Sequence, residues 1–588
     1  MIQLSKQGKA LLPIVMDASA TPQEKFAAEE LRHYLGMMST CVFTISEEQQ
    51  SPAIYIGKAA EQAGFTAPQP LDTDGFALYA QNGSVAVLGG VRGVIYGVYA
   101  LLEELGCRFF TATCEKVPFQ PELSLREFAD CQVPILEYRD HNYYEFARYP
   151  TFAVKSRLNG AFAPIPERLG GHKTYAWFVH TFEALVPPEK YGKEHPEYFA
   201  LYNGKRHTEG VQQTQLCLSN PEVLEIAVES VRRRLQEVPD AKLISVSQND
   251  KDPGCQCDAC RKIDEEEGSP AGTLLRFVNA IAERLEPEFP NVVFDTLAYQ
   301  YTRPAPKITK PRHNVCVRLC TIECCFAHPL EECDDETRHV QRPDGTRSSL
   351  LKDLQDWGKI SNRNYIWDYT TCFAHYPTPH PNWHVLQKNI QTFVKNGVKG
   401  VFEQANGASY GGTDLNELRA YVISRLLWNL DANVPALIAE FTDYYYGAAA
   451  RFIRQYIELL TDKVTRENIH VGFNDDPKHG FLTNDMLDQY DELFAKAEAA
   501  VAGDALRLWR VAKARLSIRY VRLKNNAMLH GNLDREELNR FFADWKAFGL
   551  TRIEEWVSPE TSLRGFLENR WRGVSFYKHW TDEGGEQL

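Results

Sequence analysis

The sequence lacks any uninterrupted run of 18 or more apolar residues, so no segment is long enough to cross a membrane as a helix. It also lacks an excess of basic residues, because 65 Lys and Arg stand against 78 Asp and Glu and give a formal net charge of −13. A chain without a basic field has little attraction for phosphate backbones or anionic lipid. We therefore expect neither nucleic acid nor a membrane surface among its partners.

The start of the sequence has no pattern typical of a secretory leader. Its one apolar stretch, residues 10–16, is interrupted by Pro13 and is not followed by a small-residue cleavage site. On this ground we expect a cytoplasmic protein, or a secreted or periplasmic one if a leader precedes this sequence. A disulfide-rich scaffold is excluded as well, because 14 cysteines among 588 residues are too sparse for one, and most should be free thiols.

What the sequence does contain is apolar material for more than one core. Its residues are 44% hydrophobic and 24% charged, as in ordinary globular proteins, and its length suits two to four domains. Residues 1–130 alternate short β-type runs with amphipathic helical runs, which predicts an α/β accessory domain. Residues 431–588 are helical in pattern, with Ser, Asp or Asn starts and Gly stops, and predict a C-terminal α-helical domain.

Residues 131–430 repeat β-type runs with helices between them. The runs are apolar and β-branched at first and become polar or aromatic at their carboxyl ends, which is typical of parallel barrel strands buried on both faces. We therefore predict the α/β class, with a (β/α)8 TIM barrel as the central catalytic domain. Seven strands can be placed, among them the run QLCLSN at residues 215–220, and the second strand is placed only loosely, near residues 160–163.

Carboxylates follow two of these predicted strands, at the end of the barrel where catalytic groups reside. Asn249 and Asp250 end the run LISVSQND, and Glu403 ends the run GVKGVFE before a glycine-rich loop. A carboxylate at such a position can act as a general acid or base, and the neighbouring amide can orient a substrate amide. The alternatives are that Asp250 caps the following turn and that Glu403 forms a buried ion pair with a barrel arginine.

A third carboxylate, Asp368, lies between Trp367 and Tyr369 at the end of another predicted strand, and Glu323 is a fourth. Paired carboxylates among aromatic faces suit sugar chemistry, in which one group protonates the leaving oxygen, another stabilises an oxocarbenium-like centre, and rings cover the apolar sugar faces. The pattern predicts glycoside hydrolysis in an extended polar cleft. Further substrate-binding candidates lie at or near other strand ends: Arg139, Asn142, Tyr143, His172 and Tyr299.

Three cysteines with the spacing C-x-C-x-x-C follow Asp250, namely Cys255, Cys257 and Cys260. Thiolates at this spacing can supply three ligands of a structural zinc ion, with a fourth from Cys320, Cys324, Cys325 or Cys333. The alternative is that these thiols are free or staple the loop. Because no histidine accompanies the three cysteines, we expect no catalytic metal, and we predict no cofactor.

Several strings in the sequence resemble known families. The N-terminal AAEELRHYL, IYIG, DGFALYA and VAVLGGVRGVIYGVYALLEELGCRFF resemble the accessory α/β domain that precedes the barrel in α-glucuronidases and β-hexosaminidases. HPEYFALYNGKR, QLCLSNPEV, ISVSQND and GVFEQ resemble the bacterial family labelled domain of unknown function 4838, part of which is classified as glycoside hydrolase family 163. The resemblance spans residues 20–450 approximately and implies a barrel hydrolase, since characterised members are endo-β-N-acetylglucosaminidases acting on complex N-glycans.

The resemblance implies cleavage of β-linked N-acetylglucosaminides in an N-glycan or a derived oligosaccharide. It also implies retention by substrate assistance, in which the N-acetyl oxygen of the −1 sugar attacks the anomeric carbon. Glu403 would be the general acid/base, and Asp250 with Asn249 would hold the acetamide, although the reverse assignment of the two carboxylates stays open. Two other functions stay open: an α-glucuronidase-like hydrolase in which Arg139 binds the uronate carboxylate, and a non-catalytic glycan-binding protein.

Overall fold

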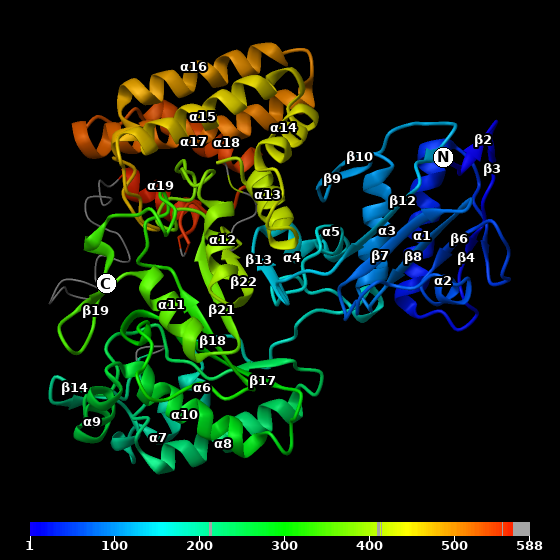
Figure 1. Ribbon diagram of the computed structural model, residues 1–588. Coiled ribbons are helices and arrows are strands. Elements are labelled where there is room, and N and C mark those ends of the chain that lie inside the picture. Colours follow the sequence, from blue (N-terminus) through cyan, green and yellow to red (C-terminus); the bar gives the residue numbers. More distant parts are fainter. Residues whose placement is uncertain (211–213, 408–411, 413, 556, 568–588) are drawn as a thin grey trace.

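A computed structural model describes residues 1–588 apart from 211–213, 408–411, 413, 556 and 568–588. Along the chain it forms an α/β region, a central barrel of parallel strands and a helical region (Figure 1). In the described part of the chain, no helix combines the length and the apolar character needed to cross a membrane.

The N-terminal region is built on one six-stranded sheet. Its strands, in spatial order, are β12 (Phe128–Gln132), β7 (Phe76–Gln81), β8 (Ser84–Gly89), β6 (Ile54–Ile56), β4 (Ile14–Val15) and β5 (Ile45–Ser46). The first three pair antiparallel and the rest pair parallel. Helices α1 (Pro22–Ser39) and α3 (Gly93–Glu104) pack together, and Thr21 and Glu24 form a capping box that starts α1.

The central region is a curled sheet of six parallel strands, which confirms the predicted fold class. The strands, in spatial order, are β13 (Tyr138–His141), β22 (Val398–Gln404), β21 (Asn364–Tyr369), β18 (Val315–Cys320), β17 (Val293–Ala298) and β16 (Leu243–Ser245). Tyr138, Tyr365 and Phe402 fill the interior of the curl together with Leu243 and Cys316. The interior is therefore a packed core, as in other parallel barrels.

Two irregular segments close the barrel between β13 and β16. The Asn159 amide donates to the Arg139 carbonyl at 3.1 Å, and the Lys173 amide donates to the Asn159 carbonyl at 2.8 Å. Tyr175 then forms a parallel bridge with Leu243. The barrel is thus a hydrogen-bonded ring in which six regular strands and two irregular segments, one at Asn159 and one around Tyr175, take the eight positions.

Two of the predicted strands are wrong. Residues 160–163 form no strand, because the carboxylate of Asp140 accepts the Phe162 amide at 3.0 Å in place of a backbone carbonyl. Gly160 lies so close to Asp140 that a Cβ would stand 2.2 Å from its side chain. Residues 215–220 are not in the barrel either, since Leu216 bridges antiparallel to Phe199 and Tyr175 takes the third barrel position.

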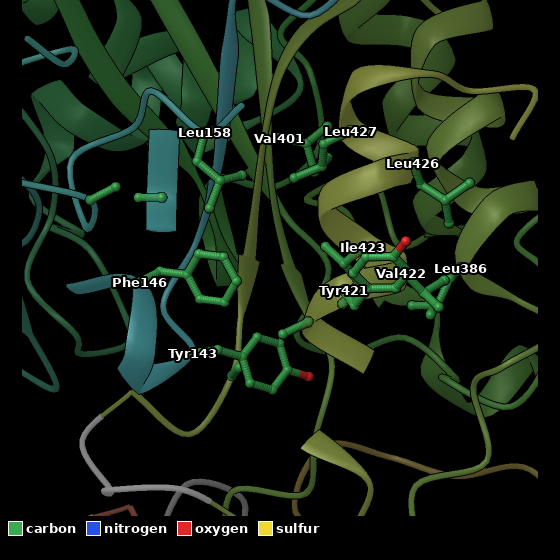
Figure 2. Packing of buried hydrophobic residues seen from close by; sticks show 14 of the residues in the cluster. Tyr143, Phe146, Leu158, Leu386, Val401, Tyr421, Val422, Ile423, Leu426 and Leu427 are labelled. Atoms are coloured by element: carbon green, nitrogen blue, oxygen red, sulfur yellow. The ribbon is translucent and has the colours of Figure 1, made fainter. Parts of the chain in front are cut away.

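Helices cover the outer face of the barrel. They include α8 (Pro221–Glu237), α10 (Pro270–Leu285), α11 (Leu350–Ile360), α12 (Leu386–Lys395) and α13 (Asn416–Trp428). Figure 2 shows Val401 of β22 pointing toward Leu427 of α13, in the same buried cluster as Leu158 and Phe146. Because side chains alternate along a strand, residues 400, 402 and 404 of β22 face inward, whereas 401 and 403 face the helices.

The helical region lies over one side of the barrel in Figure 1, coloured yellow to red. Its main helices are α14 (Val434–Tyr445), α15 (Ala450–Arg466), α16 (Asn484–Ala500), α17 (Ala505–His530), α18 (Arg535–Ala547) and α19 (Pro559–Leu567). The hydroxyl of Tyr520 on α17 lies 2.8 Å from Nδ1 of His375, in the loop after β21. The Ile553 carbonyl accepts the Tyr376 amide at 2.8 Å, so a second segment of this region also reaches the barrel loops.

Candidate active site

A cavity of about 530 Å³ opens at the carboxyl ends of the barrel strands. Every regular strand contributes to its wall, either with its last residues or with the loop that follows. The polar or aromatic contributions from these positions are Asn142 after β13, Asp250 after β16, Tyr299 after β17, Cys320 at the end of β18, Trp367 and Tyr369 on β21, and Gln404 on β22. The cavity therefore occupies the position where ligands bind in parallel barrels.

Asp250 is held in this wall by a phenol. The Tyr299 hydroxyl donates to Oδ1 of Asp250 at 2.8 Å. Burial and the nearby Asp250 carboxylate raise the pKa of Tyr299 well above its usual range, so the phenol keeps the proton that it donates. One carboxylate oxygen is thus fixed while the group itself faces the cavity.

The loop that carries Asp250 is fastened to a second segment of the chain. Gln215 donates from Nε2 to the carbonyls of Asn249 at 2.8 Å and Lys251 at 2.6 Å, and it accepts the Asn249 amide at 3.1 Å. Nδ2 of Asn249 donates to the Thr214 carbonyl at 2.6 Å. Asn249 is fully buried and does not line the cavity, so it positions the Asp250 loop.

Aromatic rings form most of the remaining wall. The Trp367 ring lies 5.0 Å from Phe402 and 5.6 Å from Phe178, and Phe402 stacks on Phe162 at 4.7 Å. The rings that line the cavity are Phe162, Phe178, Tyr299, Trp367, Tyr369, Phe373, Phe402 and Phe473. Such faces match the apolar C–H faces of sugar rings.

Two amide side chains add directional polar groups. Trp367 Nε1 donates to Oε1 of Gln404 at 2.7 Å, which leaves the Gln404 amino group to donate to Oε1 of Glu555 at 3.2 Å. Oδ1 of Asn142 accepts the Ala405 amide at 2.6 Å, so its amino group is turned away from that contact. Both amides line the cavity and can donate to a ligand.

His180 also lines the cavity, from the loop before β16. Its Nδ1 lies 2.9 Å from the Gln248 carbonyl, and a carbonyl only accepts, so the proton of the neutral ring resides on Nδ1. Nε2 is then the acceptor. The predicted His172 does not reach the cavity, and its Nδ1 contacts the Ile165 carbonyl at 3.1 Å.

Glu403 and Asp368 lie outside the cavity wall, side by side on the outer face of the sheet. They are register partners on β22 and β21, and they are 0% and 6% exposed. Burial and the Asp368 carboxyl raise the pKa of Glu403 well above its usual range, and burial raises the pKa of Asp368 to about 6. Among the described residues, neither Glu403 oxygen has a hydrogen-bond partner. Burial and the neighbouring carboxyl therefore favour the protonated form of Glu403 more than in an exposed glutamate.

Two other predicted binding residues serve the framework. Arg139 is fully buried and pairs through Nη2 with Asp74 of the N-terminal region at 2.9 Å, while Nη1 donates to the Leu136 carbonyl at 2.6 Å. The Tyr143 hydroxyl lies 3.1 Å from that of Thr370, and the ring is 4% exposed. Of the predicted residues, the structure brings Asp250, Asn142, Tyr299, Trp367 and Tyr369 together in the cavity.

Two cavity residues come from the helical region and were not predicted. Phe473 follows α15, and Glu555 follows α18. No local pattern marks either one, because each lies in an irregular segment far from the barrel strands in sequence. Gln404 was missed for a different reason: it is adjacent to Glu403, and only the inward or outward sense of β22 distinguishes the two.

The three cysteines after Asp250 gather with a fourth cysteine. The Sγ atoms of Cys255, Cys257 and Cys260 and that of Cys217 all lie within 4.8 Å of one another. The four residues predicted as candidates for the fourth position are not in this cluster. The sequence does not mark Cys217 as a ligand, because the pattern of residues 215–220 predicts a barrel strand.

The sequence of the chain matches the model of one known family. The sequence model of a family described as a domain of unknown function, DUF4838, matches residues 109–458. The chain belongs to the DUF4838 family. The match covers all six regular barrel strands, whereas Phe473 and Glu555 lie beyond it. No curated protein matches this DUF4838 chain.

Two glycoside hydrolases are among the solved structures that the chain resembles. A GH115 4-O-methyl-α-glucuronidase with specificity for decorated arabinogalactans has a TM-score of 0.59 and 14% sequence identity, over 93% of this chain and 76% of its own. A mutant Streptomyces plicatus β-hexosaminidase in complex with GlcNAc has a TM-score of 0.43 and 11% identity, over 77% and 92%. At this identity, the GH115 likeness shows that the DUF4838 chain shares that fold.

Proposed function

We propose that this DUF4838 protein is a glycoside hydrolase and that its active site is the cavity at the carboxyl ends of the barrel strands. The observation that carries the proposal is Asp250, a carboxylate oriented by Tyr299 in a cavity whose walls are mainly aromatic. Sugar rings stack on aromatic faces, and carboxyl groups supply the acid and base chemistry of glycosidic bond cleavage.

The substrate that we propose is a β-linked N-acetylglucosaminide, cleaved with retention by participation of its own acetamide. Asp250 accepts the acetamide N–H and so directs the acetamide oxygen at the anomeric carbon. Of the described residues, two carboxylates line the cavity, so we assign the proton donor to the leaving oxygen to the second one, Glu555, which Gln404 holds at 3.2 Å. This proposal replaces Glu403 as proton donor, because the Glu403 side chain lies on the outer face of the sheet.

The geometry favours a neutral sugar over a uronate. A uronate carboxylate is normally bound by a cationic side chain, most often bidentately by arginine. Among the described residues that line the cavity there is neither lysine nor arginine. Arg139, the candidate for this role, is fully buried and bound to Asp74.

The proposal is tested with substrates that differ in their leaving groups. A chromogenic N-acetyl-β-glucosaminide, the matching glucuronide and released N-glycans are assayed with the wild type and with Asp250→Asn and Glu555→Gln. Asp250→Asn is expected to lose at least about 100-fold in kcat on every substrate. Glu555→Gln is expected to lose as much on glycans but little on a dinitrophenyl glycoside, whose leaving group needs no proton.

The control is Glu403→Gln, an isosteric change at a carboxyl outside the cavity, which should retain activity within a few-fold of the wild type. Full activity of Asp250→Asn would remove that residue from the mechanism. A loss in Glu403→Gln as large as that in Asp250→Asn would restore Glu403 as the proton donor. Glycan binding without turnover of any substrate would identify a glycan-binding protein.

A further inference from the structure

Four cysteines from two separate segments converge beside the Asp250 loop. Cys217 lies just before α8, whereas Cys255, Cys257 and Cys260 lie between Asp250 and the first turn of α9 (Asp258–Glu267). Their four Sγ atoms are within 4.8 Å of one another, and those of Cys217 and Cys257 are 3.6 Å apart. All four are free thiols rather than disulfide partners.

This arrangement has the dimensions of a tetrathiolate zinc site. Zinc binds four thiolates tetrahedrally at about 2.3 Å, which places neighbouring sulfur atoms about 3.8 Å apart. We propose that Cys217, Cys255, Cys257 and Cys260 bind one structural zinc ion. Four protein ligands complete the coordination, so the ion has no open position for substrate or water and acts on the fold.

The surroundings of the cluster suit bound thiolates. The Leu201 amide donates to Sγ of Cys255 at 3.3 Å, and Nη1 of Arg206 lies 3.8 Å from the same sulfur. The Ser219 hydroxyl lies 3.1 Å from Sγ of Cys260. Hydrogen-bond donors and one cation thus surround the sulfur atoms, and they offset the negative charge that four thiolates and one zinc ion carry together.

The zinc ion joins the two segments that hold Asp250 in place. One segment contains Gln215 and Thr214, which bind the backbone and side chain of Asn249, and it continues to Cys217 two residues later. The other segment begins at Asp250 and reaches Cys255 within five residues. Binding of zinc therefore stabilises the wall of the cavity that carries Asp250, at a distance from the reacting atoms.

The test is the zinc content of the full-length protein, measured by mass spectrometry after purification without chelator. Cys257→Ser is expected to contain one equivalent of zinc less than the wild type, whereas Cys131→Ser, a change at a cysteine outside the cluster, retains the wild-type content. An unchanged zinc content in Cys257→Ser would overturn the proposal. Because metal content is measured without substrate, the result does not depend on the proposed enzymatic activity.

A second measurement applies if Cys257→Ser does not fold. Cys333→Ser, which keeps all four cysteines of the cluster but lacks a ligand of the other group (Cys325, His328, Cys333 and His470), is refolded with Co²⁺ in place of zinc, and its spectrum is recorded. Strong thiolate-to-cobalt charge-transfer bands with tetrahedral d–d bands support the site. A spectrum without thiolate bands, or a mass lower by two hydrogen atoms for each disulfide formed within the cluster, would overturn it.

A separate group of ligands carries a second, independent proposal. Cys325, His328 and Cys333 lie in the loop after β18, and His470 follows α15 in the helical region. One ligand atom of each lies within 4.8 Å of the others, and Sγ of Cys325 is 3.3 Å from Nδ1 of His328. We infer that these residues bind a second structural zinc ion, which has the Cys2His2 ligand set and fastens the helical region to the barrel.

This second site is tested with Cys333→Ser, which should lose one equivalent of zinc relative to the wild type. The double variant Cys257→Ser, Cys333→Ser should lose two. A zinc content in Cys333→Ser equal to that of the wild type would overturn the second site and leave the first unaffected. Cys131→Ser again serves as the control, because Cys131 belongs to neither group of ligands.

Discussion

At the scale of single residues, the buried acids on the outer face of the barrel set a pH dependence of stability. The folded-state pKa of Glu403 lies well above the value near 4.5 that it has when exposed. Above about pH 4.5, Glu403 loses its proton in the unfolded chain but keeps it in the folded chain until the pH reaches its folded-state pKa. The free energy of unfolding therefore falls as the pH rises through this range. One such group gives a slope of about 1.4 kcal/mol per pH unit.

Glu403→Gln removes the contribution of this carboxyl to the pH dependence of the free energy of unfolding. We expect the free energy of unfolding of the variant to fall less steeply than that of the wild type as the pH rises above about 4.5, by up to about 1.4 kcal/mol per pH unit. Urea unfolding at several pH values measures both slopes. Glu237→Gln, an exposed change on α8, should leave the wild-type slope unaltered, and equal slopes for Glu403→Gln and the wild type would contradict the assignment.

At the scale of elements, one carboxylate joins the N-terminal region to the barrel. Asp74 precedes β7 and pairs with Arg92 at 2.5 Å and with the fully buried Arg139 of β13 at 2.9 Å. Nδ2 of Asn159 donates to the same carboxylate at 2.8 Å. These contacts fasten the first barrel strand and an irregular barrel segment to the neighbouring sheet.

Asp74→Asn should therefore destabilise the protein although it changes no cavity residue. Removing one partner of a buried ion pair costs about 3–5 kcal/mol, because the other charge remains buried without compensation. The midpoint and slope of urea unfolding measure the loss. Asp130→Asn, at a partly exposed position of β12 where the carboxylate accepts from the Gln132 side-chain amide at 2.7 Å, is the control, and similar midpoints for the two variants would show that the Asp74 contacts contribute little.

The strands of the barrel show how much of the site can be predicted from the sequence. The carboxyl ends of β16, β17, β21 and β22 are recognisable in the sequence. Asp250 and Tyr299 follow the first two of these strands, and Trp367 and Gln404 lie on the last two. Which residue of a pair such as Glu403 and Gln404 faces inward depends on how β22 pairs with the strands on either side, and that is not written in the local pattern.

The remaining errors have the same origin in contacts between distant segments. Residues 215–220 have the composition of a strand, yet they bind the Asp250 loop and carry Cys217. Glu555 becomes a cavity residue only because the helical region packs over the barrel. The backbone amide of Glu555 donates to the Phe373 carbonyl at 3.0 Å. Local sequence patterns contain no information about such docking.

At the scale of the whole molecule, the helical region completes the cavity. Phe473 extends the aromatic wall, with its ring 5.6 Å from that of Tyr369. Phe473→Ala should raise KM about 5- to 30-fold with little change in kcat, because an aromatic contact contributes about 1–2 kcal/mol to binding. Steady-state kinetics measure both constants.

The control for this change is Leu506→Ala, a substitution of an exposed apolar residue on α17 of the same region. It should leave KM at the wild-type value. A wild-type KM in folded Phe473→Ala would show that the substrate does not reach the wall formed by the helical region, and it would restrict the binding site to the barrel residues.

The barrel closes at a seam where β13 pairs with β22, the last barrel strand in the sequence, and Tyr138 lies opposite Gly400. Each of β16, β17, β18 and β21 instead pairs with the barrel strand that follows it in the sequence. Contacts between distant residues are slow to form, because a long loop must be closed before they contribute. Asn142 and Gln404, on the two sides of this seam, both line the cavity. A chain emerging from the ribosome therefore closes the barrel part of its cavity only once β22 is available, and not step by step as each strand is synthesised.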